Sequence, residues 1–507
     1  MLASLRTAAL FGMDACPVHV EVDVSFGLPT FTMVGLPDAS VRESRDRVRS
    51  AIRNSGYEFP PHRITVNLAP ADVRKAGASF DLPIALGILA ASGVVERREI
   101  ANLLLLGELS LDGSIHPTRG VLPIAAAARR DGVAGVLVPA ANASEAAIVT
   151  GLDVFAVASL VQAVGILNNP STRPAPPASP VLTGPLASPD SSDLPDLEDV
   201  RGQLLARRAL EIAAAGGHNL LLVGPPGAGK TMMARRMAGI LPPLTFDEAL
   251  EVTAVHSVAG LLRPGVGLLT RRPCRAPHHT ISDAALVGGG SQPRPGEVSL
   301  AHHGVLFLDE MLEFNRHVLE VLRQPLEEGA VTIARAARTA VFPARFMLVG
   351  AMNPCPCGFA GDPSRECRCT PQQAIKYRGR LSGPLRDRLD LTVEVPALDP
   401  SALDVAVGGE SSAVVRARIV AARDRQRARY GESAATTNAA LTPALLRAHT
   451  PLDARCARVL TTAARRMALS VRAYDRVRKV ARTIADLAGE ERIAADHVAE
   501  ALQFRLG

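Results

Sequence analysis

The sequence contains no tryptophan, and aromatic residues make up only 3% of its 507 residues. Stacking of nucleobases on aromatic side chains is therefore not expected to dominate any recognition of nucleic acid. No apolar stretch approaches the roughly 20 residues that a membrane-spanning helix requires, and the short apolar stretch 7–13 is closed by Asp14. We therefore expect a protein without membrane spans or a signal peptide, which stays in a reducing cytoplasm.

A strong excess of one charge sign is also missing. The chain has 56 Lys and Arg residues against 50 Asp and Glu residues, which gives a net charge of +6. Such a balance permits an anionic partner without requiring one. Hydrophobic residues, in contrast, make up 47% of the chain, which is ample for large packed cores. The length predicts about three domains.

Composition divides the chain into four segments. Residues 166–194 are rich in Pro, Ser and Ala, which is typical of an interdomain linker. Residues 1–165 alternate strand-like and helical stretches and are expected to form a mixed α/β domain. Residues 195–398 alternate buried strands with helices, which predicts a parallel sheet covered on both faces. Residues 399–507 are predicted to form a smaller helical domain.

A glycine-rich loop identifies a nucleotide site. "GPPGAGKT" lies between a buried strand and a helix and matches the G-x-x-x-x-G-K-[ST] pattern, whose backbone N–H groups cradle phosphates at a helix N-terminus. Lys230 is expected to hold the β- and γ-phosphates, and Thr231 to bind Mg²⁺. The expected nucleotide-binding residues are Gly224, Pro225, Pro226, Gly227, Ala228, Gly229, Lys230 and Thr231.

Two adjacent acids complement this loop. "GVLFLDE" is an apolar strand that ends in Asp309 and Glu310, which places both carboxylates at the edge of the sheet where the phosphates bind. Asp309 is expected to hold Mg²⁺, and Glu310 to orient and polarise the attacking water. Together with the loop, the pair indicates a P-loop NTPase that uses ATP and Mg²⁺.

The order of "GPPGAGKT", "LFLDE", "MNP" and "LRDRLDL" resembles that of AAA+ ATPases. The resemblance implies that Asn353 is the sensor-1 residue, which holds the lytic water. It implies that Arg388 is an arginine finger, which reaches the γ-phosphate of a neighbouring subunit. Arg386 and Arg380 are the alternatives for this finger.

The resemblance also implies a sensor-2 arginine. Arg472 in "LSVRAYDRVRKVARTIADLAG" matches that position, and Arg476 is the second choice. These arginines are also compatible with solvated positions on helix faces.

A long insertion separates Lys230 from Asp309, which are 79 positions apart. It resembles the insertions of the helix-2-insert group of AAA+ proteins, which includes magnesium-chelatase motor subunits. Four of its histidines are interpreted as loop residues lining a ring pore, with zinc ligation and plain structural roles left open. They are His278, His279, His302 and His303.

"VRKAGASFDLPIALGIL" in the first domain resembles the proteolytic domain of Lon, in which Lys75, Gly77 and Ser79 would frame the nucleophile. The stretch matching the Lon segment that supplies the catalytic lysine has Leu122 to Ile124 at those positions and no lysine. A serine without a neighbouring base is a poor nucleophile. We therefore expect a Lon-protease-like (S5-type) fold without peptidase activity.

Four cysteines form a C-x-C-x9-C-x-C pattern directly after Asn353. Four soft ligands at this spacing suit structural Zn²⁺; iron–sulfur ligation and four metal-free thiols are the alternatives. A metal here would anchor the loop that leaves the sensor-1 strand. The expected ligands are Cys355, Cys357, Cys367 and Cys369. The other cysteines, Cys16, Cys274 and Cys456, read as ordinary buried thiols.

Across essentially its whole length the chain resembles the YifB/ComM family, through "GLPDASVRESRDRVRSAI", "FDLPIALGIL", "MNPCPCG" and "CRCTPQQ" among others. The resemblance implies a homo-oligomeric, hexameric ring that acts on single-stranded or branched DNA as a helicase, promoting branch migration in recombination or natural transformation. The alternatives are a motor subunit of a magnesium-chelatase-type complex, an ATP-dependent Lon-like protease and a nucleotide-binding scaffold.

Overall fold

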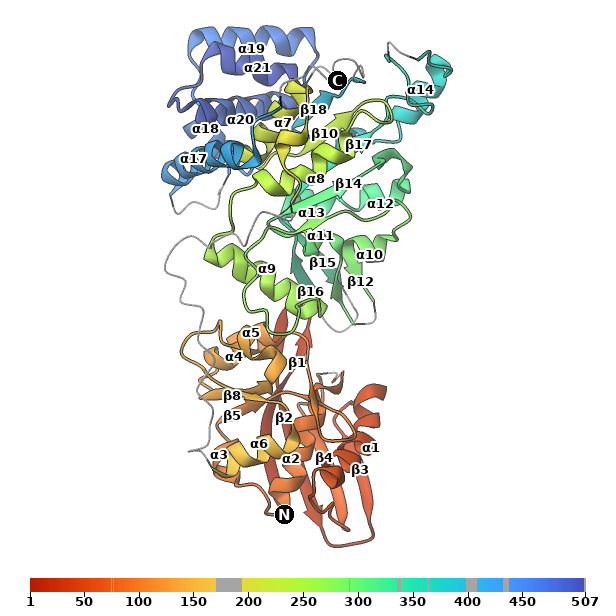
Figure 1. The fold of residues 1–507 in the computed structure, drawn as a ribbon, viewed down its shortest axis with the longest axis vertical. Coiled ribbons are helices and arrows are strands. Elements are labelled where there is room, and N and C mark those ends of the chain that lie inside the picture. The colour runs from red at the N-terminus through yellow and green to blue at the C-terminus, as the bar shows by residue number, and fades with distance from the viewer. Residues whose placement is uncertain are drawn as a thin grey trace.

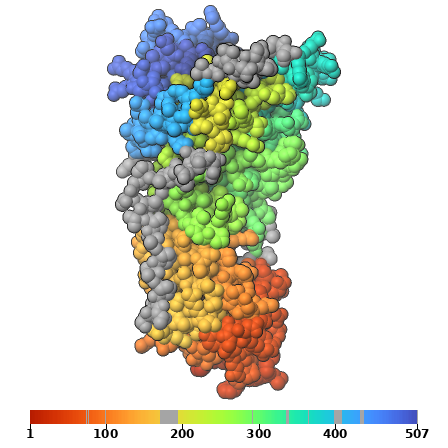
Figure 2. Space-filling model, in the orientation of Figure 1, coloured from red at the N-terminus to blue at the C-terminus, as the bar shows by residue number. Residues whose placement is uncertain are grey.

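The computed structural model shows an elongated molecule with a strand-rich part at one end, a helical part at the other and a second sheet between them (Figures 1 and 2). It describes residues 1–73, 75, 77–169, 194–290, 292–334, 339–362, 365–397, 408–431 and 437–505. Most of the expected linker, residues 170–193, lies outside the described residues. None of the described helices combines the length and the apolar character needed to cross a membrane.

The first part is a seven-stranded mixed sheet in the order β3-β4-β2-β1-β5-β8-β9, as expected from the alternation of strand-like and helical stretches. β2 runs antiparallel to β1 and β4, and the other neighbours are parallel. The strands are β1 (Leu2–Phe11), β2 (Asp14–Ser25), β3 (Thr30–Val34), β4 (Arg63–Ala69), β5 (Leu103–Leu105), β8 (Gly135–Pro139) and β9 (Asp153–Val157).

Helices cover this sheet. α2 is buried along its whole length, which explains why its sequence, "DLPIALGILAA", is apolar on every face. The helices are α1 (Ala39–Asn54), α2 (Asp81–Ala91), α3 (Arg97–Ile100), α4 (Val121–Arg130), α5 (Ala143–Ala146) and α6 (Leu160–Asn168). α6 thus includes residues 166–168, which the sequence had placed in the linker.

The second sheet is parallel throughout, in the order β11-β14-β17-β10-β18. Its central strands are buried on both faces and are therefore nearly continuous apolar stretches. The strands are β10 (Leu220–Val223), β11 (Cys274–Arg275), β14 (Val305–Leu308), β17 (Met347–Met352) and β18 (Leu391–Glu394). The connecting helices are α7 (Leu204–Gly216), α8 (Lys230–Ile240), α12 (Arg316–Glu320), α13 (Arg323–Glu328), α14 (Pro371–Arg378) and α15 (Gly383–Arg386).

The last part is helical, as predicted. Its residues share one apolar core with α7 and α8, so the helices are packed onto the parallel sheet rather than forming a separate unit (Figure 1). They are α17 (Ser412–Tyr430), α18 (Pro443–His449), α19 (Ala454–Arg466), α20 (Val471–Ala488) and α21 (Ala495–Gln503).

The insertion before β14 and a later hairpin join the second sheet to the first part. Ser257 of the insertion donates a hydrogen bond to the buried carboxylate of Glu145. Gly12, at the turn between β1 and β2, lies directly against Ala340 of the later hairpin. The elements concerned are α9 (Phe246–Ala259), α10 (Asp283–Val287), β12 (Gly288–Gly289), β13 (Arg294–Pro295), α11 (Glu297–Leu300), and the hairpin β15 (Ala330–Ala334) and β16 (Thr339–Pro343).

Candidate nucleotide-hydrolysis site

The glycine-rich loop connects β10 to α8, which begins at Lys230. Gly227 and Gly229 have φ values of 81° and 88°, a left-handed conformation that glycine adopts without strain. The Lys230 Nζ turns back into the loop and donates to the carbonyl oxygens of Gly224, at 2.7 Å, and Pro225, at 2.8 Å. Burial lowers the pKa of Lys230, while Asp309 and Glu310 act in the opposite direction. The ammonium group therefore lies at the centre of the loop.

The two acids lie where their strand ends, beside the loop. The Thr231 hydroxyl donates to Asp309 Oδ2 at 2.7 Å, and the Glu310 N–H donates to Asp309 Oδ1 at 3.0 Å. A hydroxyl and a carboxylate are the oxygen ligands that Mg²⁺ prefers, so these residues fit the ion. Glu310 has a φ of 49°, and an αL conformation in a residue other than glycine is typical of functional sites.

Asn353 joins the same cluster from the end of the neighbouring strand β17. Its Oδ1 accepts a hydrogen bond from Lys230 Nζ at 3.2 Å. Because β14 and β17 are parallel neighbours, their carboxyl ends meet at one edge of the sheet. The structure thus brings together Lys230, Thr231, Asp309, Glu310 and Asn353, as the sequence predicted.

His279 belongs to this cluster and was not predicted there. Its Nδ1 lies 3.8 Å from Glu310 Oε2, and its ring meets the buried ring of Phe314 edge to face. It follows β11, which pairs with β14, so it reaches the same edge of the sheet as Glu310. The signal in the sequence is "CRAPHH". Its strand portion, Cys274–Arg275, has only two residues and is too short to be recognised.

Arg388 lies at the opposite edge of the sheet. It precedes β18, and β18 pairs in parallel register with β10, Leu220 opposite Leu391. The glycine-rich loop instead follows β10, whose four residues span about 13 Å at ~3.3 Å per residue. Arg388 is only 6% exposed and forms an ion pair with Glu327. Burial, together with Arg472 and Arg476, lowers its pKa.

Arg388 lines a cavity of about 720 Å³. Part of its lining comes from the residues just before each of the four long strands β10, β14, β17 and β18. Arg476 lines it too and donates to Asp390 at 3.0 Å, while Arg472 is exposed on the preceding turn of α20. Four carboxylates line the cavity, Glu248, Glu327, Glu328 and Asp390, and three of them pair with arginines of the same wall. They are outnumbered by six basic side chains, which are Arg272, Arg345, Arg388, Arg423, Arg476 and Lys479.

The two other finger candidates lie differently. Arg380 pairs with Glu313, at 3.3 Å, on the same side as Glu310. Arg386 is exposed at the end of α15. Arg388 is thus the one of the three that lines the basic cavity.

The four histidines considered for a pore form two separate pairs. His302 and His303 both contact Glu251 Oε2, at 2.7 and 2.9 Å. His302 is 1% exposed, so the expectation that it lines a pore is wrong. Its Nδ1 accepts a hydrogen bond from the backbone of Arg345, which leaves the proton of the neutral ring on Nε2, facing Glu251. A protonated Nε2 is not a metal ligand, so this pair does not fit zinc. His278 stacks beside His279 at the nucleotide site.

Ser79 lines a cavity of about 420 Å³ between the first part and the insertion, together with Ile124. Ile124 is one of the residues that the sequence placed where Lon carries its lysine. Lys75 is fully buried, and its Nζ donates to the carbonyl of Pro70. Among the described residues, none donates to or accepts from the Ser79 hydroxyl. The described lining of this cavity contains no lysine, and its carboxylate, Glu108, forms no hydrogen bond with Ser79.

The four clustered cysteines meet beside the glycine-rich loop, with all four sulfurs within 4.8 Å of one another. Of the three others, only Cys456 is a buried thiol as expected. Cys274, in β11, is exposed, and Cys16, in β2, is half-buried.

Family models of magnesium chelatase cover most of the chain. The model of magnesium chelatase subunit ChlI matches residues 196–403, that of the subunit's C-terminal region matches 409–505, and a further ChlI model matches 20–142.

Full-length relatives are similar throughout. The chain is 44% identical to competence protein ComM of Haemophilus influenzae over 508 residues, 99% of this chain and 97% of the relative. It is 43% identical to the uncharacterized protein YifB of Escherichia coli over 506 residues, again 99% and 97%. A magnesium-chelatase 67 kDa subunit of Chlorobaculum tepidum is 30% identical over 162 residues, 31% of this chain and 23% of that protein.

Proposed function

Because the chain belongs to the YifB/ComM family of magnesium chelatase-like proteins, we propose that it is an ATP-hydrolysing AAA+ motor that assembles into a hexameric ring and acts on DNA. Within that class we propose a ComM-like helicase that promotes branch migration during recombination or natural transformation. The convergence of Lys230, Thr231, Asp309, Glu310 and Asn353 at one edge of a parallel sheet carries the ATPase assignment.

Each residue of this cluster has a role that follows from its position. Lys230 exchanges its carbonyl partners in the loop for the β- and γ-phosphates, whose charge an ammonium group stabilises. Glu310 accepts a proton from the attacking water, and Asn353 orients that water from the opposite side. Thr231 and Asp309 would hold Mg²⁺, which neutralises developing charge on the phosphates.

The position of Arg388 supports a site completed by two subunits. Arg388 and its own Lys230 lie at opposite edges of the sheet, so Arg388 has to act on the nucleotide of a neighbouring copy. Arg476 and Arg472 lie at the same edge as Arg388. They would likewise act on the nucleotide of the neighbouring copy. Such a head-to-tail contact is heterologous, and it gives a ring when the rotation between neighbouring copies closes.

Binding to DNA follows from the family and from the ring. The net charge of +6 is small for 507 residues, so phosphate contacts would be local to the inside of the ring. Affinity for DNA should then fall as salt rises, since each phosphate contact releases a counterion.

A motor subunit of a magnesium-chelatase-type complex is the second candidate, since the models for that subunit match three regions of the chain. The stretch shared with the 67 kDa subunit covers under a third of the chain, whereas the likeness to ComM covers nearly all of it. A surviving Lon-like protease is disfavoured by the apolar side chain of Ile124 beside Ser79.

The direct test is a branch-migration and strand-displacement assay on purified protein with synthetic forked and four-way DNA. The proposal predicts ATP-dependent movement by the wild type and none by Glu310→Gln, which still binds ATP. ATPase activity that no DNA stimulates, with no movement of any strand, would instead favour the chelatase-type motor.

A further inference from the structure

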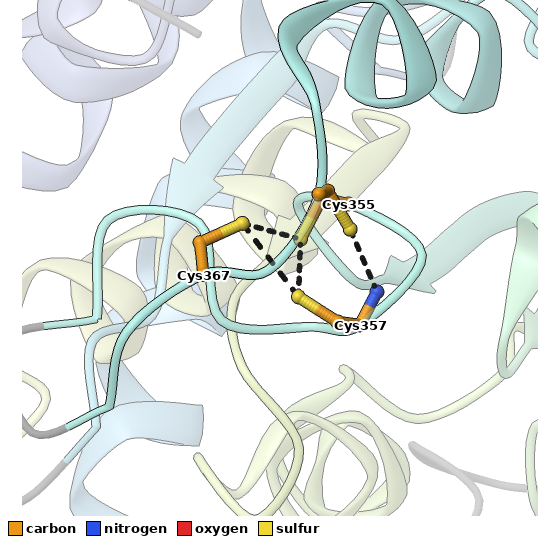
Figure 3. Close-up of side chains that lie close together, drawn as sticks. Cys355, Cys357 and Cys367 are labelled. Atoms are coloured by element: carbon orange, nitrogen blue, oxygen red, sulfur yellow. Dashed lines mark hydrogen bonds between the residues drawn. The ribbon is translucent and has the colours of Figure 1, made fainter.

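The four clustered cysteines lie near the two ends of the single connection between β17 and α14. Cys355 and Cys357 follow β17, and Cys367 and Cys369 precede α14. Figure 3 shows the sulfurs of Cys355, Cys357 and Cys367 pointing toward one another. Cys355 Sγ lies 3.4 Å from Cys357 Sγ and 3.6 Å from Cys367 Sγ, and the latter two sulfurs are 3.6 Å apart.

We propose that Cys355, Cys357, Cys367 and Cys369 bind one structural Zn²⁺ ion, and that this metal-bound loop supports the ATP site from behind the glycine-rich loop. Four sulfurs around a tetrahedral Zn²⁺ with Zn–S bonds of ~2.3 Å lie about 3.8 Å from one another. The distances between the sulfurs are close to this value. They are far from the ~2.05 Å of a disulfide bond.

The spacing also argues against a multi-iron cluster. In such a cluster the cysteines bind different iron atoms, so their sulfurs have to stand farther apart than four thiolates on one ion. All four sulfurs here fit within 4.8 Å, which matches a single tetrahedral ion. A single iron atom in the same four-sulfur site is an outcome that the experiment below distinguishes.

Backbone groups are placed to stabilise thiolates. The Ala360 N–H donates to Cys355 Sγ at 3.3 Å, and the Cys357 N–H donates to Cys369 Sγ at 3.4 Å. Hydrogen bonds of this kind offset the negative charge that four thiolates leave on a divalent ion, and they fix the orientation of the ligands. The Arg378 Nε donates to the Pro354 carbonyl at 2.9 Å, which ties α14 to the end of β17.

The cysteine loop touches the nucleotide site through Gly358. Gly358 has a φ of 88°, and a β-carbon there would lie 2.6 Å from Cδ of Pro226 and 3.9 Å from Cγ of Asn353. The loop therefore lies directly against the glycine-rich loop and the sensor-1 residue. A metal that fixes this loop would hold both in position, whereas a loop without metal would release them.

Metal content decides the first half of the proposal. Protein purified without added metal is expected to contain about one zinc atom per chain by elemental analysis. Cys367→Ser and Cys369→Ser should lose it, while Cys274→Ser, which changes an exposed cysteine elsewhere, should keep it. Less than about a tenth of a zinc atom per folded chain, or one iron atom in its place, would overturn the assignment.

A second measurement uses only wild-type protein, so it decides the question even if the cysteine variants fail to fold. Wild-type protein whose zinc is displaced by a mercurial, which is then stripped from the cysteines with excess thiol and removed, and which is reloaded with Co²⁺, should show the intense visible absorption of a tetrahedral four-thiolate site. Cobalt bound without that absorption would contradict four-cysteine ligation. Neither measurement depends on ATP hydrolysis or on DNA. The zinc proposal can therefore be refuted while the proposed motor function stands, and the motor function can be refuted while the zinc proposal stands.

Substitutions of two glycines in the cysteine loop test whether this loop supports the ATP site. Gly358→Ala should weaken binding of a fluorescent ATP analogue about tenfold, equivalent to ~1.4 kcal/mol, while zinc is retained. Gly361→Ala is the matched control, because Gly361 has a similar φ of 82° but nothing within 4 Å of an added β-carbon. Equal affinities in both variants would refute the contact with the glycine-rich loop.

Discussion

Lys230 follows β10 and Arg388 precedes β18, and because these strands are parallel neighbours the two side chains lie at opposite edges of one sheet. The first edge carries Lys230, Thr231, Asp309, Glu310 and Asn353, which we propose bind phosphates and activate water. The second carries a basic cavity of about 720 Å³. Under the proposed function, each chain would therefore carry two half-sites, and a neighbouring chain would supply the half that completes each one.

The first prediction separates nucleotide binding from hydrolysis. Lys230→Ala removes the ammonium group at the centre of the loop and should abolish binding of ATP. Glu310→Gln removes only the group that activates water, so it should bind ATP normally and hydrolyse it about 100- to 10,000-fold more slowly. Binding by fluorescence and phosphate release by a colorimetric assay measure the two effects. Equal hydrolysis by Glu310→Gln and wild type would refute the role of Glu310.

The second prediction concerns His279 as a positioning residue for Glu310. His279→Ala should lower kcat about tenfold with little change in KM, because the ring orients the catalytic carboxylate without touching the phosphates. His317→Ala is the control, since His317 is exposed and pairs with Asp283 instead. His279→Gln, which keeps a polar side chain beside Glu310, should restore part of the loss. A rise in KM alone, or equal effects at both histidines, would exclude this role.

The third prediction concerns the first domain. Ser79 shares its cavity with Ile124 and not with a lysine, so the purified protein should not digest casein, with or without ATP. Ser79→Ala should leave ATP hydrolysis unchanged. Digestion of casein by the wild type but not by Ser79→Ala would instead show that the chain is a protease.

Much of the nucleotide site could be predicted from the sequence because its residues are contiguous with recognisable strands. "GPPGAGKT" and "LFLDE" each follow an apolar stretch, and parallel strands deliver their carboxyl ends to one edge of the sheet. His279 could not be predicted in the same way, because β11 has only two residues. Its position depends on pairing with β14, which the local sequence does not encode.

The histidines show a second limit of the sequence. His302 and His303 looked like loop residues free to line a pore, but His302 is buried against Glu251 and the backbone of Arg345. Adjacent histidines carry no periodicity that separates a buried ring from an exposed one. The mixed sheet of the first part, in contrast, followed from alternating strands such as "HVEVDV" and "RITVNL", which lie in β2 and β4.

The most direct test of the account mixes two inactive variants, Lys230→Ala and Arg388→Ala. In a mixed ring, some boundaries pair an intact Lys230 of one subunit with an intact Arg388 of its neighbour. ATP hydrolysis should therefore return in part on mixing, although each variant alone remains inactive. No recovery in rings shown to contain both variants would contradict a site completed across two subunits.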